Sequence, residues 1–222
     1  MPAILFGSIS TLADTSELQR RAFNRAFAEH GLDWEWDREQ YRAMLDSSGG
    51  AARVEEYARS RGETVDAAAV HGTKSALFQQ DLASSEVTPR PGVLETIRGA
   101  KDSGLRLGFV TTTSPANVAA LFAALAPQVT ADDFDVVVDA DAVDAPKPDP
   151  AAYRFALERL GEDAASCVAV EDNAGGVRAA AAAGVACVAF PNENTAGHDL
   201  AGAQRSVDHL ELDDLRSSLG TR

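Results

Sequence analysis

Four polar segments of this chain carry residue types that bind anions or hard cations. The first is Gly7-Ser8-Ile9-Ser10-Thr11, which offers hydroxyl groups and backbone amides. The others are Thr111-Thr112-Thr113, a segment with Lys147 between two prolines, and Glu171-Asp172-Asn173. Threonine and lysine suit phosphate oxygens, and an acidic pair suits a cation such as Mg²⁺, which prefers oxygen ligands. These residues can bind one ligand together only if the four segments lie close to one another in the folded chain.

Short apolar runs and helical stretches along the chain provide the means to bring them together. The apolar runs lie at 3–6, 105–110, 136–138, 167–170 and 185–190. Helices are predicted between most of them, at 93–103, 115–125, 150–160 and 174–183. This alternation predicts an α/β fold with a parallel sheet covered on both faces. Because such sheets bind ligands beyond the carboxyl ends of their strands, we expect the four polar segments in one crevice.

Each polar segment, taken alone, also has a simpler interpretation. The threonine triplet is compatible with a plain strand exit, and a lysine between prolines with a solvated loop. Glu171 and Asp172 are compatible with the cap and first-turn charge of the helix predicted at 174. The coincidence of all four at expected strand ends is what favours a functional site.

Residues 16–85 interrupt the alternation, because they contain no convincing strand and indicate four or five helices. Ser16 and Gln19 have the spacing of a capping box at the start of the first. We expect 16–85 to form an all-α cap domain above the strand ends. Residues 1–15 and 86–222 would form the core domain, with TPRPG (88–92) as the returning linker.

Composition excludes several classes of protein and partner. The net charge of −14 disfavours nucleic-acid and anionic-membrane surfaces, which reward clustered Lys and Arg. Cys167 and Cys187 lie in apolar stretches and are expected to be small buried side chains. GxGxxG, GxSxG and HExxH motifs are absent from the sequence. Without a leader-like or bilayer-spanning run, we expect a cytoplasmic protein. The sequence identifies no protein partner.

The chain resembles the haloacid dehalogenase-like (HAD) superfamily over nearly its whole length. It is most similar to the branch of CbbY-type sugar-bisphosphate phosphatases and β-phosphoglucomutases. That resemblance implies a Rossmannoid three-layer core, and the insertion looks like a type-1 cap. The motifs that carry it are AFNRAFAEHGLDWEW (22–36), SSGGAAR (47–53), RPGVLETI (90–97), GLRLGFVTTTSPANV (104–118), DAPKPDPAAYRFALERLG (144–161) and VEDNAGGVRAAAAAG (170–184).

The resemblance also reveals what this chain lacks. In the family the first strand ends in DxDGT, whose two aspartates act as nucleophile and proton shuttle; those positions here are Gly7 and Ile9, and the motif glycine is Ser10. By the same correspondence Thr111 and Lys147 would bind phosphate. The metal ligands would be Glu171, Asp172 and the backbone carbonyl of Ile9. In the cap, Arg53 would contact substrate, whereas Ala51 replaces a family lysine.

These departures predict a phosphatase-like pseudoenzyme, inactive by the family mechanism, that binds a sugar phosphate or a similar anion. Mg²⁺ binding is expected to be weakened or absent because the carboxylate at position 7 is lost. Two alternatives stay open. One is an active hydrolase with Ser8, Ser10 or Asp14 as its nucleophile. The other is a scaffold for a partner protein, with a vestigial crevice.

Overall fold

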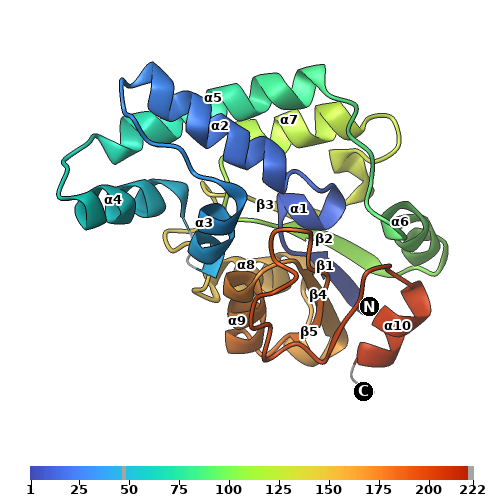
Figure 1. The fold of residues 1–222 in the computed structure, drawn as a ribbon. Coiled ribbons are helices and arrows are strands. Elements are labelled where there is room, and N and C mark those ends of the chain that lie inside the picture. The colour runs from blue at the N-terminus through green and yellow to red at the C-terminus, as the bar shows by residue number, and fades with distance from the viewer. Residues whose placement is uncertain (47–48, 220–222) are drawn as a thin grey trace.

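The computed structural model describes residues 1–46 and 49–219 and is built on one parallel sheet (Figure 1). The strands, in the sheet order β3-β2-β1-β4-β5-β6, place β1 and β4 at the centre. Their bounds are β1 Ala3–Phe6, β2 Arg106–Val110, β3 Val136–Val138, β4 Cys167–Glu171, β5 Ala186–Ala189 and β6 Arg205–Ser206. The five predicted apolar runs are therefore strands. The two-residue β6 was not predicted, because its side chains are exposed and carry no apolar pattern.

Helices cover both faces of the sheet, which confirms the three-layer α/β architecture. Alternate residues of β1 separate the layers: Ile4 and Phe6 belong to one buried cluster, and Ala3 and Leu5 to another. The first cluster contains side chains of α6, α7 and α10, and the second those of α8 and α9. Their bounds are α6 Val93–Asp102, α7 Pro115–Leu125, α8 Ala151–Leu160, α9 Ala174–Ala182 and α10 Leu212–Ser218.

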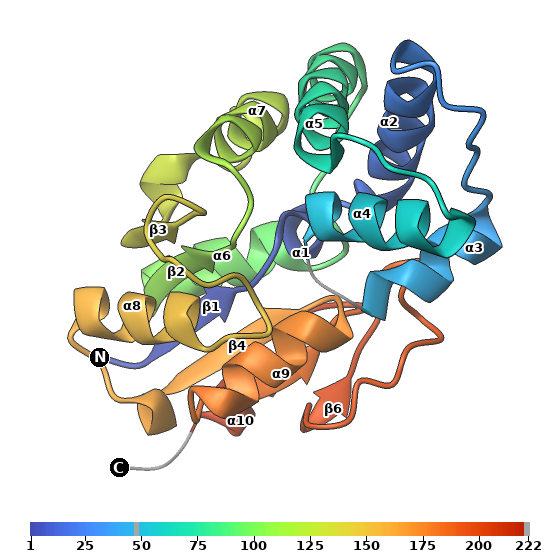
Figure 2. The ribbon, with the colours of Figure 1, turned by 90° about the vertical axis from the view of Figure 1, so that its left-hand side faces the viewer.

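The helical segment 16–85 stands over the carboxyl edge of the sheet (Figure 2). In the described part of this segment the helices are α2 Ser16–Glu29, α3 Arg38–Ala43, α4 Gly50–Arg61 and α5 Ala67–Ser84, with a 3₁₀ turn η1 at Met44–Asp46. Rings of Phe23, Phe27, Trp34 and Trp36 pack against one another inside it. The division of the chain into a cap and a core domain stays a prediction.

The start of α2 differs from the predicted capping box. The N-cap is Thr15, and Ser16 is already the first helical residue. Asp14 accepts hydrogen bonds from the Ser16 amide at 3.1 Å and from its hydroxyl at 2.9 Å. Local sequence spacing missed this because a one-residue shift of the cap leaves the helical pattern almost unchanged.

Two further expectations concern the cysteines and the length and polarity of the helices. Cys167 and Cys187 are buried free thiols, as predicted. Within residues 1–46 and 49–219, every helix is too short or too polar to cross a bilayer. Ser47 and Ser48, which open the SSGGAAR motif, lie outside the described residues.

Candidate functional site

Strand register brings three of the predicted site segments to one edge of the sheet. Phe6 of β1 pairs with Phe109 of β2 and with Val170 of β4. One position further along, Gly7, Val110 and Glu171 therefore stand side by side on adjacent strands. Parallel strands end at the same edge, so this row forms the floor on which the polar segments meet.

Lys147 extends from the loop before α8 into this row. Its ammonium donates to the carbonyl oxygens of Gly7 and Val110, the latter at 2.7 Å. It also pairs with Glu171 Oε1 at 2.6 Å. The residue is only 6% exposed. The resemblance assigns the Lys147 ammonium to phosphate, but most of its N–H groups donate to atoms of the protein itself.

Glu171 is fully buried behind the floor and is not among the residues that line the cavity above it. Its Oε1 accepts from Lys147 and, at 2.7 Å, from the Tyr153 hydroxyl of α8. Burial raises the pKa of this carboxyl despite the neighbouring ammonium. Glu171 therefore differs from the cavity-facing acid that the sequence predicted.

Asp172 does face the cavity, and both of its carboxylate oxygens are hydrogen-bonded. Oδ1 accepts from Ser8 Oγ at 2.7 Å and from Asn173 Nδ2 at 2.8 Å. Oδ2 accepts from Asn192 Nδ2 at 2.9 Å. Asn192 belongs to the loop after β5, a segment that carried no site prediction.

Above the floor lies a cavity of about 450 Å³ between the sheet edge and the helical segment. Gly7, Ile9, Thr111, Lys147 and Asp172 line its core end. The Thr111 hydroxyl is buried and accepts from the Thr113 amide at 3.2 Å, which orients it at the end of β2. All the predicted core positions except Glu171 therefore reach one cavity, although their roles there stay predictions.

Three basic side chains line the opposite end of this cavity: Arg53 of α4, and His71 and Lys74 of α5. Arg53 Nε donates to the Met44 carbonyl at 2.9 Å, and its guanidinium lies 5.9 Å from the Tyr41 ring centroid. Burial, reinforced by Lys74 and Arg53, lowers the pKa of His71 to about 4. Sequence reasoning identified Arg53 and missed the other two.

Lys74 is 3% exposed. Its ammonium donates to Gln19 Oε1 at 2.9 Å and lies 4.9 Å from the ring centroids of Phe23 and Phe78. Burial, with a smaller contribution from Arg53, lowers its pKa to about 7. A sequence signal existed: Lys74 follows Val70 by four residues and precedes Phe78 by four, so it occupies the apolar face of α5.

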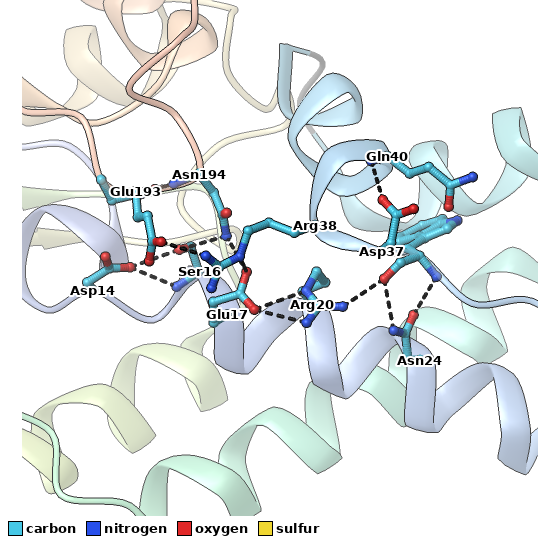
Figure 3. A network of polar contacts seen from close by, with 12 residues as sticks. Asp14, Ser16, Glu17, Arg20, Asn24, Asp37, Arg38, Gln40, Glu193 and Asn194 are labelled. Atoms are coloured by element: carbon cyan, nitrogen blue, oxygen red, sulfur yellow. Dashed lines mark hydrogen bonds and ion pairs between the residues drawn. The ribbon is translucent and has the colours of Figure 1, made fainter.

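Of the three displaced nucleophiles considered from sequence, only Ser8 both lines the cavity and contacts a carboxylate. The Ser10 hydroxyl is paired with that of Thr15 at 3.2 Å. Asp14 is engaged with Ser16 at the start of α2 (Figure 3). The same figure shows Asn194 donating to Glu17 and Arg38 paired with Glu193, contacts that join the helical segment to the loop after β5.

The oxygen-bearing groups at the core end that the resemblance assigns to Mg²⁺ all have partners within the protein. Asp172 is satisfied by three protein donors, and Glu171 is enclosed with Lys147. The Ile9 carbonyl accepts from the Ala13 amide at 3.2 Å. Within the described ranges, no cluster of three or more His, Cys, Asp or Glu side chains could hold a metal ion. Mg²⁺ usually binds through one or two accessible carboxylates, with water and phosphate completing its octahedron.

Comparison with known proteins gives consistent matches along the chain. A family model described as a haloacid dehalogenase-like hydrolase matches residues 1–184. Protein CbbY of Cereibacter sphaeroides is 42% identical over 209 residues, which cover 93% of this chain and 91% of that protein.

Two solved structures are similar over most of the chain. One is CbbY from Rhodobacter sphaeroides in complex with phosphate, with a TM-score of 0.87 and 41% identity, covering 94% of this chain and 95% of that chain. The other is an aspartate-to-asparagine mutant of the same protein in complex with xylulose-1,5-bisphosphate. It has a TM-score of 0.89 and 39% identity, and the match covers 100% of both chains.

Proposed function

This chain belongs to the haloacid dehalogenase-like hydrolase family, and from that membership we propose that it binds a small phosphorylated ligand without cleaving it. One observation carries the proposal. Gly7, at the position of the family nucleophile, lines the cavity but has no side chain that could attack phosphorus. Ile9, at the position of the proton shuttle, can neither donate nor accept a proton through its side chain.

The expected loss of rate is large. Covalent phosphoryl transfer divides one difficult step into two by forming an aspartyl-phosphate, so the carboxylate is indispensable to that route. Removal of a nucleophile in other enzymes costs about a millionfold in rate, or roughly 8 kcal/mol of activation free energy.

The class of ligand follows from the two polar ends of the cavity. Hydroxyl and amide groups at the core end, with the Arg53 guanidinium and the Lys74 ammonium beneath the helical segment, suit an anion with more than one charged group. The related Rhodobacter sphaeroides protein has been solved with xylulose-1,5-bisphosphate, which supports a sugar phosphate as the ligand here. In this proposal the segment 16–85 serves as the cap domain over the ligand.

We propose further that binding does not require Mg²⁺. Hydrolases of this family generally use that ion, but the donors here are engaged by Ser8, Asn173 and Asn192 or enclosed with Lys147. Affinity is therefore expected to be the same in EDTA as in millimolar Mg²⁺.

Calorimetric titration with xylulose-1,5-bisphosphate, together with a phosphate-release assay, tests the proposal. Saturable binding is expected, with phosphate release no greater than in buffer. Arg53→Met should weaken binding at least about tenfold because a charged contact is lost. Arg61→Met is the matched control, since Arg61 lies on the same helix but outside the cavity.

Robust phosphate release that increases with protein concentration and disappears in folded Lys147→Ala protein would overturn this function. Failure of every phosphorylated sugar to bind would instead favour a vestigial scaffold. The open cavity argues against that outcome, because side chains have not filled it.

A second candidate function, hydrolysis with Ser8 as nucleophile, is favoured by one contact. Ser8 Oγ donates to Asp172 Oδ1 at 2.7 Å, so a carboxylate stands ready to accept the hydroxyl proton. Carboxylates in general are weak bases for a serine hydroxyl, which ranks this function second.

Mass spectrometry after incubation with substrate separates the two functions. Hydrolysis through Ser8 would add one phosphoryl mass to a peptide containing Ser8 and would be lost in Ser8→Ala but kept in Ser10→Ala. An unmodified peptide together with saturable binding favours the non-cleaving function.

A further inference from the structure

The chain has three lysines, and one of them has surroundings unlike those of the other two. The ammonium of Lys101 pairs with Asp133 at 2.6 Å. That of Lys147 pairs with Glu171, also at 2.6 Å. An opposite charge this close favours the ammonium form, which has no lone pair for a nucleophilic attack. Lys74 differs because its nitrogen donates to an amide oxygen instead of a carboxylate.

Burial and a neighbouring positive charge favour the neutral amine at Lys74. The rings of Phe23 and Phe78 lie against its nitrogen, and although their faces attract an ammonium, they supply no counter-charge. Burial, together with the like charge of Arg53, lowers the pKa of Lys74 to about 7. About half of the molecules therefore carry a neutral, nucleophilic amine at neutral pH.

We propose that Lys74 is a nucleophile that forms an imine with the carbonyl group of a phosphorylated aldehyde or ketone held in the cavity. The residue lines that cavity, and Gln19 fixes the position of its nitrogen. Gln19 Nε2 donates to Thr15 Oγ1 at 3.5 Å, so that Oε1 is left to accept from the lysine at 2.9 Å. An amine that donates one N–H to this oxygen keeps its lone pair for the attack.

The step balances without any oxidant or reductant. The lone pair of the amine forms a C–N bond to the carbonyl carbon while the C=O π bond opens onto oxygen, which gives a carbinolamine. The carbonyl oxygen then leaves as water and takes both hydrogens of the amine with it. A C=N bond to Lys74 remains, and the addition of water reverses the sequence.

The ligand class proposed above supplies such a carbonyl group. Xylulose-1,5-bisphosphate is a ketose whose C5 hydroxyl carries phosphate, so that hydroxyl cannot close a five-membered ring on the C2 ketone. The ketone therefore stays open to attack by an amine. This inference rests on the proposed function for its ligand and adds reversible covalent capture to it.

Reductive trapping followed by peptide mass spectrometry tests the imine. The protein is incubated at about pH 7.5 with cyanoborohydride and either xylulose-1,5-bisphosphate or pyridoxal 5′-phosphate, a phosphorylated aldehyde. We expect a reduced adduct on the Lys74 peptide with both probes, formed at least about tenfold faster than on the exposed Lys101. Inorganic phosphate should slow the labelling of Lys74 and leave that of Lys101 unchanged, because phosphate competes only for the cavity.

Two variants serve as controls. Lys74→Arg keeps the positive charge but cannot form the imine, so xylulose-1,5-bisphosphate should bind it in calorimetry and leave no adduct at position 74. Lys101→Met removes a lysine outside the cavity and should keep full labelling at Lys74. The mapping in the wild-type protein needs no variant, so its result does not depend on whether Lys74→Arg folds.

The outcomes separate this inference from the proposed function. Sugar that binds in calorimetry while both probes leave Lys74 unmodified would overturn the inference and leave the proposed function standing. Labelling of Lys101 as fast as Lys74 would also overturn it. Rapid labelling of Lys74 by pyridoxal 5′-phosphate, in a protein that binds no phosphorylated sugar, would support the nucleophile and contradict the proposed function.

Discussion

Lys74 is a buried cation in a strongly acidic protein, and its ammonium donates to an amide oxygen rather than to a carboxylate. Gln19 and Phe23 face it from α2, while His71 and Phe78 flank it on α5. Burial and the Arg53 charge lower its pKa to about 7. Between about pH 7 and pH 10.5, Lys74 is protonated in the unfolded chain but mostly neutral in the folded one. The free energy of unfolding contributed by this group therefore rises with pH across that range.

Anion binding should show the opposite dependence on pH. Lys74 is charged below its pKa, so affinity for sulfate, which stays dianionic, should fall several-fold from about pH 6 to about pH 8.5. Calorimetric titration across this range measures it. In Lys74→Met the profile should flatten, whereas Lys101→Met, at an exposed ion pair with Asp133, should keep it. An unchanged pH profile in Lys74→Met would show that the pH dependence of sulfate affinity does not come from Lys74.

The returning linker 88–92 contacts the ends of two strands of the sheet through Arg90. Arg90 donates to the carbonyls of Ser10 at 2.9 Å, Phe190 at 2.7 Å and Pro191 at 2.7 Å. Its guanidinium also lies 3.4 Å from the Phe190 ring centroid. One side chain thus connects the ends of β1 and β5, and the loops after both strands carry residues of the cavity.

Gly92 is the N-cap of α6 and is expected to tolerate no side chain. Its φ is +80°, and a Cβ atom would overlap the Leu210 carbonyl oxygen. Gly92→Ala should therefore cost about 3 kcal/mol or more of unfolding free energy. Gly104→Ala has a similar φ of +68° with open space around it, and should cost only about 1 kcal/mol. Urea unfolding measures the free energy of unfolding of both variants. Equal decreases would show that overlap with the Leu210 carbonyl adds nothing to the cost at Gly92.

At the scale of the whole molecule, one buried cluster runs from the sheet into the helical segment. It includes Ile4 and Phe6 of β1 together with Phe23, Trp34 and Trp36. Figure 1 shows α5 of the helical segment beside α7, which packs on the sheet. A continuous core favours unfolding as a single unit.

Tryptophan emission provides a local probe of that cooperativity, because both tryptophans lie in 16–85. We expect the emission midpoint to coincide with the midpoint followed by far-UV circular dichroism, which reports on all helices. A tryptophan transition at clearly lower urea would instead indicate that the helical segment unfolds independently, as two separable domains would.

The sequence by itself determined the sheet and most of its helices. Runs such as AILF and VVV are apolar on both sides, which only a strand covered on both faces can satisfy. It also identified the polar residues at the strand ends, because parallel strands bring their carboxyl ends together. By resemblance, it also predicts that the family's nucleophilic carboxylate is missing at Gly7, which stays a prediction.

Only the tertiary structure decided where Glu171 and Lys74 lie. The sequence placed Glu171 correctly at the end of β4, but the direction of a long side chain depends on the space its neighbours leave. That space is created by Gly7 and Gly176, which are 169 positions apart (176 − 7) and meet only in the fold. Lys74 likewise faces the cavity because α5 packs against α2, a contact between helices that no local pattern specifies.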